Sequence, residues 1–494
     1  MRGPGFAVAL FLLCGAAIAS DVKSPHALPQ KTISKRVPVT TTSPQARMIF
    51  DQAMVTFERF RINETLEYLR AATRKDPAFA QAFILISELT SSPEEQNQAR
   101  GKAKSLASHV SPGEQLLIRW LAGGQEESYV PAIAAMNDLL ARYPQDPHLL
   151  FLAGRWLEYQ DRYEQSAMLL EKAVALEPDY PAAVNELGYA YAHLGQFDKA
   201  LAAMAKYVAL QPEEPNPHDS YGEILRMAGK FEEALEQYRM AVRIDPSFGS
   251  DLGIADTLAL MGKEQEARAQ YARGLPFVKT EAERVDRETQ SAATWVRENN
   301  YKQADHALRE VARHAHGDGL AVAEAKAHRL MAMYEPDFRT VVKHLQAAEN
   351  ALNDGHPISK NDHDAEWARI LCLRARRAGE VHVTELATAS VEQLEAMAQN
   401  SRSQVIQLSY HAAEGALLMA EEKYAEAIPH LQEDSENPFA LQMLWQAYQQ
   451  TGAQSEAEKV AKRLAALNDP TVEQALIVPA FRASLVSQVE QAPR

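Results

Sequence analysis

Residues of one kind return every 34 positions along the first half of this 494-residue chain. Three kinds of residue keep this spacing. They are the prolines Pro144, Pro178, Pro212 and Pro246, the small residues Ala132, Ser166, Ala200 and Ala234, and the aromatic residues Tyr129, Tyr163, Phe197 and Phe231. Self-similarity at a period of this length is typical of repeat proteins, in which each unit buries its apolar face against its neighbours. The chain is therefore predicted to fold as a stack of similar units.

The residues between these markers predict that each unit is a pair of helices. Segments rich in Ala, Leu and Glu recur with helical spacing from about residue 45 to residue 467, and no segment alternates as a strand does. Gly195 and Gly229 fall where a first helix needs a left-handed residue to end, and each proline stops a second helix. Gly188 in a first helix and Ala200 in a second are expected to face each other where the helices cross. The predicted fold class is all-α.

Two consecutive units carry the residues of a known repeat. In one, Leu187-Gly188 is followed by Tyr191, Ala200, Met204 and Pro212, and in the next, Tyr221-Gly222 is followed by Leu225, Ala234, Tyr238 and Pro246. In this pattern the chain resembles the tetratricopeptide-repeat family. The resemblance implies a solenoid, a right-handed superhelix of antiparallel helix pairs, whose inner groove commonly holds an extended or helical segment of a partner protein.

The same pattern divides the chain. Residues 45–278 are predicted to form an N-terminal repeat array, with its clearest repeats at 113–146, 147–180, 181–214 and 215–248. Residues 279–468 are predicted to form a C-terminal array of degenerate helical repeats, and residues 469–494 a cap, because the last unit of a solenoid needs its apolar face covered. Residues 20–44 are rich in Pro, Ser, Thr and Lys without periodicity, and are predicted to be a flexible leader.

The N-terminus has the pattern of an export signal. Arg2 precedes an almost unbroken apolar run over residues 6–18, and Ala17-Ile18-Ala19 fits a signal-peptidase site, so residues 1–19 are predicted to be removed. The run is too short for a comfortable membrane span, and no transmembrane segment is expected after cleavage. Cys14 lacks the preceding small residue of a lipoprotein signal, so we interpret it as part of the apolar run. The mature protein is expected to be periplasmic, in a bacterium, or secreted.

The net charge bears on the class of partner, and the cysteine content bears on disulfide formation. The formal net charge is −15 at pH 7, which argues against a nucleic-acid partner because phosphates favour basic surfaces. Cys372 is the one cysteine outside the predicted signal peptide, so the mature chain cannot form an internal disulfide. We interpret this thiol as buried and inert.

Two histidine-containing segments are candidate metal sites. His314 and His316 flank Ala315 near Asp318, and a loop carries His356, Asp362, His363 and Asp364. The first pair is predicted at a helix C-terminus, where cationic side chains favour the helix dipole. Asp362 or Asp364 is predicted to cap the helix that starts near residue 365. We therefore interpret both segments as structural and predict no metal, no cofactor and no catalytic residue. The sequence also lacks the P-loop, the dinucleotide fingerprint and the nucleophile elbow.

The predicted function is that of an exported scaffold or adaptor, which holds a protein or peptide segment in the concave groove of the superhelix. The groove wall is expected from residues of the first helices that point away from the second helices. They are Phe151, Arg155, Tyr159, Asn185, Tyr189, His193, Asp219, Glu223 and Arg226. Two other hypotheses remain open. One is an enzyme or metal-dependent module in the atypical region 281–380, which would enclose a polar pocket, and the other is an architectural subunit of an envelope complex.

Overall fold

The computed structural model describes residues 35–491 apart from 91, 127, 402 and 435. In this part of the chain the regular elements are 25 α-helices and two short 3-10 turns, with no strand. The prediction of an all-α fold is confirmed. The predicted signal peptide, with Cys14, lies outside the described residues. Within the described residues, no helix is both long and apolar enough to cross a membrane.

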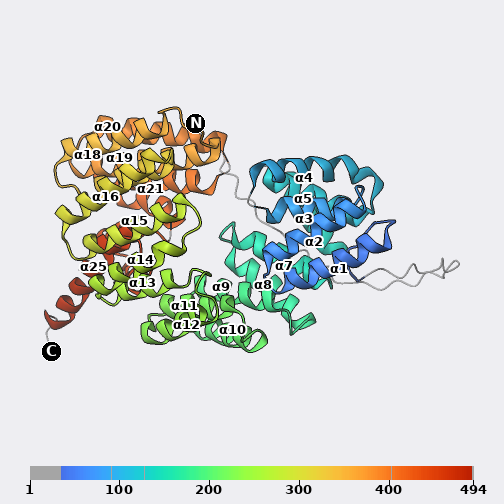
Figure 1. Cartoon of the computed structure of the whole chain (residues 1–494). Helices are drawn as coiled ribbons and strands as arrows, with labels where there is room; N and C mark the ends of the chain where they lie inside the picture. The colour runs from blue at the N-terminus through green and yellow to red at the C-terminus, as the bar shows by residue number, and fades with distance from the viewer. Residues whose placement is uncertain (1–34, 91, 127, 402, 435, 492–494) are drawn as a thin grey trace, which may run out of the picture.

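Helices α1 to α24 form consecutive pairs (Figure 1). The pairs of the N-terminal half are α1 (Pro44–Glu58) with α2 (Ile62–Lys75), α3 (Ala80–Leu89) with α4 (Pro93–Leu106), α5 (Pro112–Gln125) with α6 (Tyr129–Arg142), α7 (Pro147–Glu158) with α8 (Tyr163–Leu176), α9 (Pro181–His193) with α10 (Phe197–Leu210), α11 (Pro215–Met227) with α12 (Phe231–Ile244), and α13 (Asp251–Leu260) with α14 (Glu264–Gly274). The later pairs are α15 (Glu281–Arg297) with α16 (Tyr301–Gly317), α17 (Ala321–Tyr334) with α18 (Phe338–Leu352), α19 (Lys360–Glu380) with α20 (Thr384–Asn400), α21 (Gln404–Ala420) with α22 (Tyr424–Glu433), and α23 (Pro438–Gln450) with α24 (Gln454–Ala466). A last helix, α25 (Val472–Gln491), follows them, and the 3-10 turns are η1 (Ala107–His109) and η2 (Leu275–Phe277).

Caps and left-handed turn residues set the ends of these helices. Asp146 opens α7 by accepting hydrogen bonds from backbone N–H groups of its first turn, and a proline follows it. Between the helices of a pair the chain needs one residue with positive φ. Asp161, Gly195 and Gly229 supply it at 51°, 69° and 74°. The predicted role of the two glycines is confirmed.

The first and second helices of a pair cross closely, and large side chains of the second helix lie nearest to three glycines of the first helices. A Cβ built on Gly188 would lie 2.5 Å from Met204 of the second helix. Gly154 and Gly222 meet Leu170 and Tyr238 in the same way, at 2.7 and 3.0 Å. Gly188 and Ala200 are both buried in the packed pair α9–α10, as predicted, but the side chain nearest to Gly188 is that of Met204, one turn after Ala200. The missing Cβ makes room for a large side chain rather than for a small one.

Ala200 is nevertheless a fully buried position, with no exposed surface. We expect Ala200→Leu to cost about 1–3 kcal/mol of unfolding free energy, because extra methylenes in a filled core force neighbouring side chains from their rotamers. Ala202→Leu is the matched control, since Ala202 lies on the same helix and is exposed. Thermal unfolding of the two variants measures the difference, and equal melting of Ala200→Leu and the parent would contradict the observed packing.

Residues 36–43 correct the last part of the predicted flexible leader over residues 20–44, whereas residues 20–34 lie outside the described residues. They cross the loops between successive helix pairs, where carboxylates accept hydrogen bonds from them. The bonds are Val37 N to Asp146 Oδ2 at 2.7 Å, Thr40 N to Glu114 Oε1 at 2.8 Å, and Thr41 Oγ1 to Asp76 Oδ2 at 2.5 Å. The composition of this segment indicated a flexible chain. The carboxylates that bind it come from different repeats, and they form one row only when the repeats stack.

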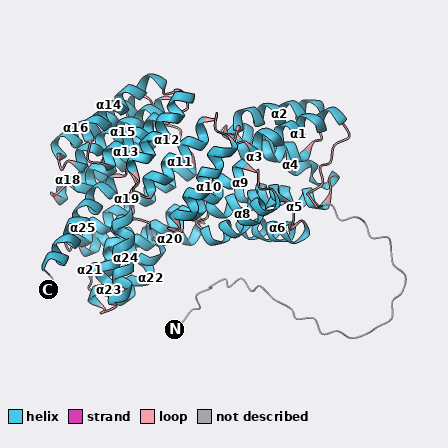
Figure 2. Cartoon of the chain, turned by 90° about the horizontal axis from the view of Figure 1, so that it is seen from below, coloured by secondary structure: helices cyan, strands magenta, loops and turns pink. Residues whose placement is uncertain are grey.

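The array is curved, with the first helices of the N-terminal pairs on its inner side. Successive first helices contact one another, α7 with α9 and α9 with α11. They therefore lie on the concave side of the curved array. The curve brings distant parts of the chain together, since α1 contacts α9, and Asn468 Nδ2 donates to the Met227 carbonyl at 3.2 Å. Helix α25 packs against α15, α17 and α23. Figure 1 shows α25 beside α15, and Figure 2 shows it on the side of the molecule where α23 and α24 lie. The C-terminal segment therefore joins the two ends of the C-terminal array as well as covering the last pair.

Candidate partner-binding site

The nine predicted groove residues lie on α7 or at its C-terminal end, on α9 and on α11. The fold buries three of them. Phe151 has no exposed surface, and Asn185 and Arg226 expose only 4% and 6% of theirs. The prediction that these three side chains line an open groove is wrong. The other six are at least partly exposed.

Phe151 is covered by the first helix pair. Its ring lies 5.6 Å from that of Phe57 and 6.4 Å from that of Phe60, both centroid to centroid, and 5.2 Å from that of Tyr180. The curvature of the array carries the end of α1 onto α7, and Phe60 turns the chain there with a φ of 61°. Phe151 is therefore a core residue where the first pair closes onto the fourth.

Arg226 is covered by the C-terminal segment instead. Its Nη1 donates to the Asn468 carbonyl at 3.5 Å, and its Nη2 donates to Glu223 Oε1 at 3.2 Å. Asn185 is buried within α9, which contacts both neighbouring first helices, α7 and α11. In both cases the element that covers the side chain is distant in sequence or belongs to another repeat. The helical spacing of the residue itself therefore could not predict its burial.

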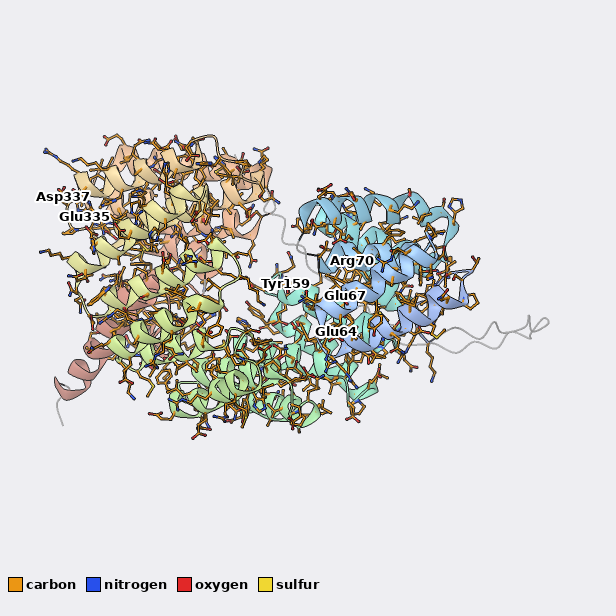
Figure 3. The ribbon with its side chains drawn as sticks, in the orientation of Figure 1. Glu64, Glu67, Arg70, Tyr159, Glu335 and Asp337 are labelled. Carbon is orange, nitrogen blue, oxygen red and sulfur yellow. The ribbon has the colours of Figure 1, made fainter. Side chains whose placement is uncertain are left out.

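Arg155 and Tyr159 form the open part of the predicted wall. Tyr159 exposes 63% of its surface, and it lies on the side of the N-terminal repeats that is turned toward the C-terminal array (Figure 3). Arg155 donates to the Tyr159 hydroxyl from Nη2 at 3.0 Å, and its guanidinium carbon lies 5.6 Å from the centre of the Phe60 ring. These contacts fix the guanidinium beside the exposed ring, so a partner meets a preorganised aromatic and cationic surface.

Two carboxyl groups that the sequence analysis missed lie beside Arg155. Burial, followed by the charge of Glu186, raises the pKa of Glu158, and burial raises the pKa of Glu186. Burial and the neighbouring carboxylate therefore favour the protonated form of Glu158 over its charged form. A spacing of three residues from Arg155 could have indicated Glu158. Nothing local marks Glu186, which comes from the next repeat.

The far end of the predicted wall is engaged in contacts within the chain. Tyr189 donates from its hydroxyl to Glu223 Oε2 at 2.8 Å. His193 Nδ1 lies 3.5 Å from Glu436 Oε1, in the loop before α23. Burial raises the pKa of Asp219 to about 6. Tyr159, by contrast, is exposed, and Arg155 is half-buried beside it.

The structure tests the positions predicted for the histidines. His314 and His316 lie in the last turn of α16, which confirms their placement at a helix C-terminus. His314 Nδ1 lies 2.9 Å from Glu288 Oε2. His316 instead meets His356 and two carboxylates from other segments.

The helix cap predicted at Asp362 or Asp364 is wrong. Helix α19 begins at Lys360, and Ser359 caps it by accepting a hydrogen bond from the Asp362 N–H at 3.0 Å. The first turn, residues 360–363, carries Lys360 and Asp362 and no apolar residue, so the apolar pattern of the sequence began only after it. Asp364 pairs with His363, Nδ1 to Oδ1 at 3.2 Å.

The region 281–380 continues the packing of helix pairs through α15 to α19. A hollow of about 220 Å³ lies between α14, η2, α15 and α16, and its lining mixes Leu275, Ala292 and Val311 with Glu288 and Glu310. Continuation of the repeat packing favours the solenoid interpretation over a separately folded catalytic module.

Comparison with known families agrees with this architecture. Residues 157–224 match the sequence profile described as tetratricopeptide repeat, which spans the end of α7 to the middle of α11. A search of curated proteins found no match.

Three solved structures illustrate what this chain is similar to in fold. The MamA protein is 19% identical, with a TM-score of 0.30 over 33% of this chain and 91% of that chain. A chain of the APC/C hetero-tetramer Cut9–Hcn1 is 16% identical, with a TM-score of 0.39 over 84% of this chain and 79% of that chain. A tetratricopeptide repeat protein from Parabacteroides merdae is 12% identical, with a TM-score of 0.36 over 62% of this chain and 100% of that chain.

Proposed function

Because this chain is built from tetratricopeptide repeats, we propose that it is a scaffold or adaptor that binds a segment of a partner protein rather than a catalyst. The exposure of Tyr159 carries the proposal. A tyrosine that exposes 63% of its surface, beside an anchored guanidinium, is a combination enriched at the centres of protein interfaces.

The chemistry of the wall suits a peptide. The Tyr159 ring offers apolar area, Arg155 offers N–H donors, and the carboxyl pair of Glu158 and Glu186 offers both an acceptor and a donor as long as it holds its proton. A peptide backbone presents donors and acceptors in alternation, so it can use both kinds of group. The net charge of −15 gives no attraction to nucleic acid.

Replacing Tyr159 with alanine tests this site. We expect at least tenfold weaker capture of the partner, because truncating an aromatic hot spot costs about 2 kcal/mol or more. Tyr68→Ala is the matched control, since Tyr68 is also an exposed tyrosine, at 39%, but lies on the second helix α2. Affinity capture from a cell-envelope extract, quantified by mass spectrometry, measures the loss of each bound protein.

Melting of both variants should stay near that of the parent, because an exposed side chain contributes little to the core. Equal capture by folded Tyr159→Ala and the parent would move the interface away from α7. Loss of capture in Tyr68→Ala as well would place the partner on the outer face.

We also propose that the protein is exported, on the strength of the sequence pattern at residues 1–19. The N-terminus of the protein recovered from the periplasm or medium should then be Ser20. Recovery in the membrane fraction with an acyl group on Cys14 would overturn cleavage after Ala19 and establish a lipid anchor instead.

A further inference from the structure

Four side chains with metal-ligating atoms meet where α16 ends, α17 begins and the loop of residues 353–359 passes. They are His316 of α16, Glu324 of α17, and Asp354 and His356 of the loop. One ligand atom each of His316, Glu324 and Asp354 lies within 4.8 Å of the other two. The sequence keeps these residues in three separate segments, and only the stacking of the helix pairs brings them together.

Three nitrogen–oxygen separations in the cluster are close to those of a tetrahedral zinc site. His316 Nδ1 lies 3.0 Å from Glu324 Oε2 and 3.9 Å from Asp354 Oδ2, and His356 Nε2 lies 3.4 Å from the same Asp354 oxygen. Ligand atoms about 2.0–2.1 Å from a tetrahedral zinc ion are about 3.4 Å from one another. The observed distances are close to this value for His316, Glu324 and Asp354. His356 contacts Asp354 but is not within 4.8 Å of all three other ligand atoms, so its ring must turn further toward the ion on binding.

The backbone orients the two loop ligands. A Cβ on Gly319 would lie 3.2 Å from His356 Nδ1, so the ring rests on this glycine and turns its Nε2 toward Asp354. Asp354 Oδ1 accepts a hydrogen bond from the His356 N–H at 3.0 Å, which leaves Oδ2 directed at the histidines. Such supporting contacts are what fix ligands in metal sites.

The charges of the cluster also suit a divalent cation. Two carboxylates and two neutral imidazoles carry a charge of −2, and the C-terminal end of α16 adds partial negative charge beside His316. The side chains of Glu324 and Asp354 are only 16% and 22% exposed, so solvent screens their repulsion incompletely. Mixed nitrogen and oxygen ligands favour zinc, whereas calcium needs six to eight oxygens.

We propose that His316, Glu324, Asp354 and His356 bind a zinc ion that fixes the loop before α19 to the junction of α16 and α17. The site revises the interpretation of His316 as a helix-end residue without a ligand role. It is structural, because all four positions are filled by side chains.

Calorimetric titration of zinc chloride into the full-length mature protein, after chelator treatment and dialysis, tests the proposal. We expect saturable binding of one ion per chain and a higher melting temperature with zinc. His316→Ala and Asp354→Asn should each weaken binding at least tenfold, because even changes to supporting groups cost about 10–100-fold. His314→Ala is the matched control, since it lies on the same helical turn and pairs with Glu288.

The four side chains are surface or half-buried groups, so the variants should melt like the parent without metal. The proposal is overturned if the parent shows no saturable binding, or if His316→Ala and Asp354→Asn bind zinc as tightly as the parent. Equal weakening in His314→Ala would also overturn it, because the ion would then bind elsewhere on α16.

Discussion

Glu366→Leu is expected to lower the free energy of unfolding by about 3–5 kcal/mol, because it leaves a buried guanidinium without its partner. Glu366 of α19 accepts a hydrogen bond from Arg329 Nε of α17 at 2.6 Å, and the two side chains are 2% and 8% exposed. Arginine cannot lose its proton in a protein, so Arg329 stays charged in the core. The next nearest carboxylate is that of Glu473, at 3.9 Å.

The double variant Arg329→Met/Glu366→Leu is the control that separates this effect from lost volume. Removing both charges leaves no buried group unpaired, so we expect it to recover most of the lost stability. Chemical unfolding of the parent, both single variants and the double variant gives the coupling energy as a double-mutant cycle. A double variant as unstable as Glu366→Leu would show that packing, rather than the ion pair, dominates at this position.

Features set within one repeat could be predicted from the sequence. The helix-pair fold and the left-handed residues Gly195 and Gly229 depend on neighbours within a few residues, and each was predicted at its observed position. The close contact at Gly188 was also predicted, but its partner was one turn away, because sequence spacing does not give the angle at which two helices cross.

Features that arise from the curvature of the array could not be predicted. Phe151 is buried by Phe57 and Phe60, and Arg226 is covered by Asn468, which is 242 residues away. The superhelix decides which repeats return to contact one another, and small rotations at many junctions add up to that result. The Arg329–Glu366 pair could not be predicted for another reason, since it joins the first helices α17 and α19 of neighbouring repeats.

Of the predicted groove, Tyr159 is exposed at the end of α7, and Arg155 is half-buried between Tyr159 and Phe60. The candidate site is therefore smaller than the predicted groove. Glu158 and Glu186 were missed because the sequence analysis took one face of each first helix, whereas carboxyls from two repeats lie beside Arg155.

A second large loss of stability is expected from a substitution in the C-terminal helix, α25. We expect Phe481→Ala to cost about 3–5 kcal/mol, as truncation of buried phenylalanines does. Phe481 of α25 is 3% exposed, and its ring meets that of Trp445 edge to face with centroids 5.1 Å apart. Phe481→Leu keeps most of the volume and should cost less than about 1.5 kcal/mol.

Helix α25 contacts α15 and α17 in the first part of the C-terminal array and α23 in its last pair. Loosening of α25 should therefore loosen both ends of this array. Arg482, the next residue, donates to the carbonyls of Ala465 and Leu467 at 2.9 Å each, so α25 is also tied to the chain that follows α24. Hydrogen exchange should therefore become faster in α15 and α23 of Phe481→Ala, with no change in the distant pair α5–α6. Faster exchange in α23 alone would show that α25 only caps the last pair, and the closure of the C-terminal array would then depend on other contacts.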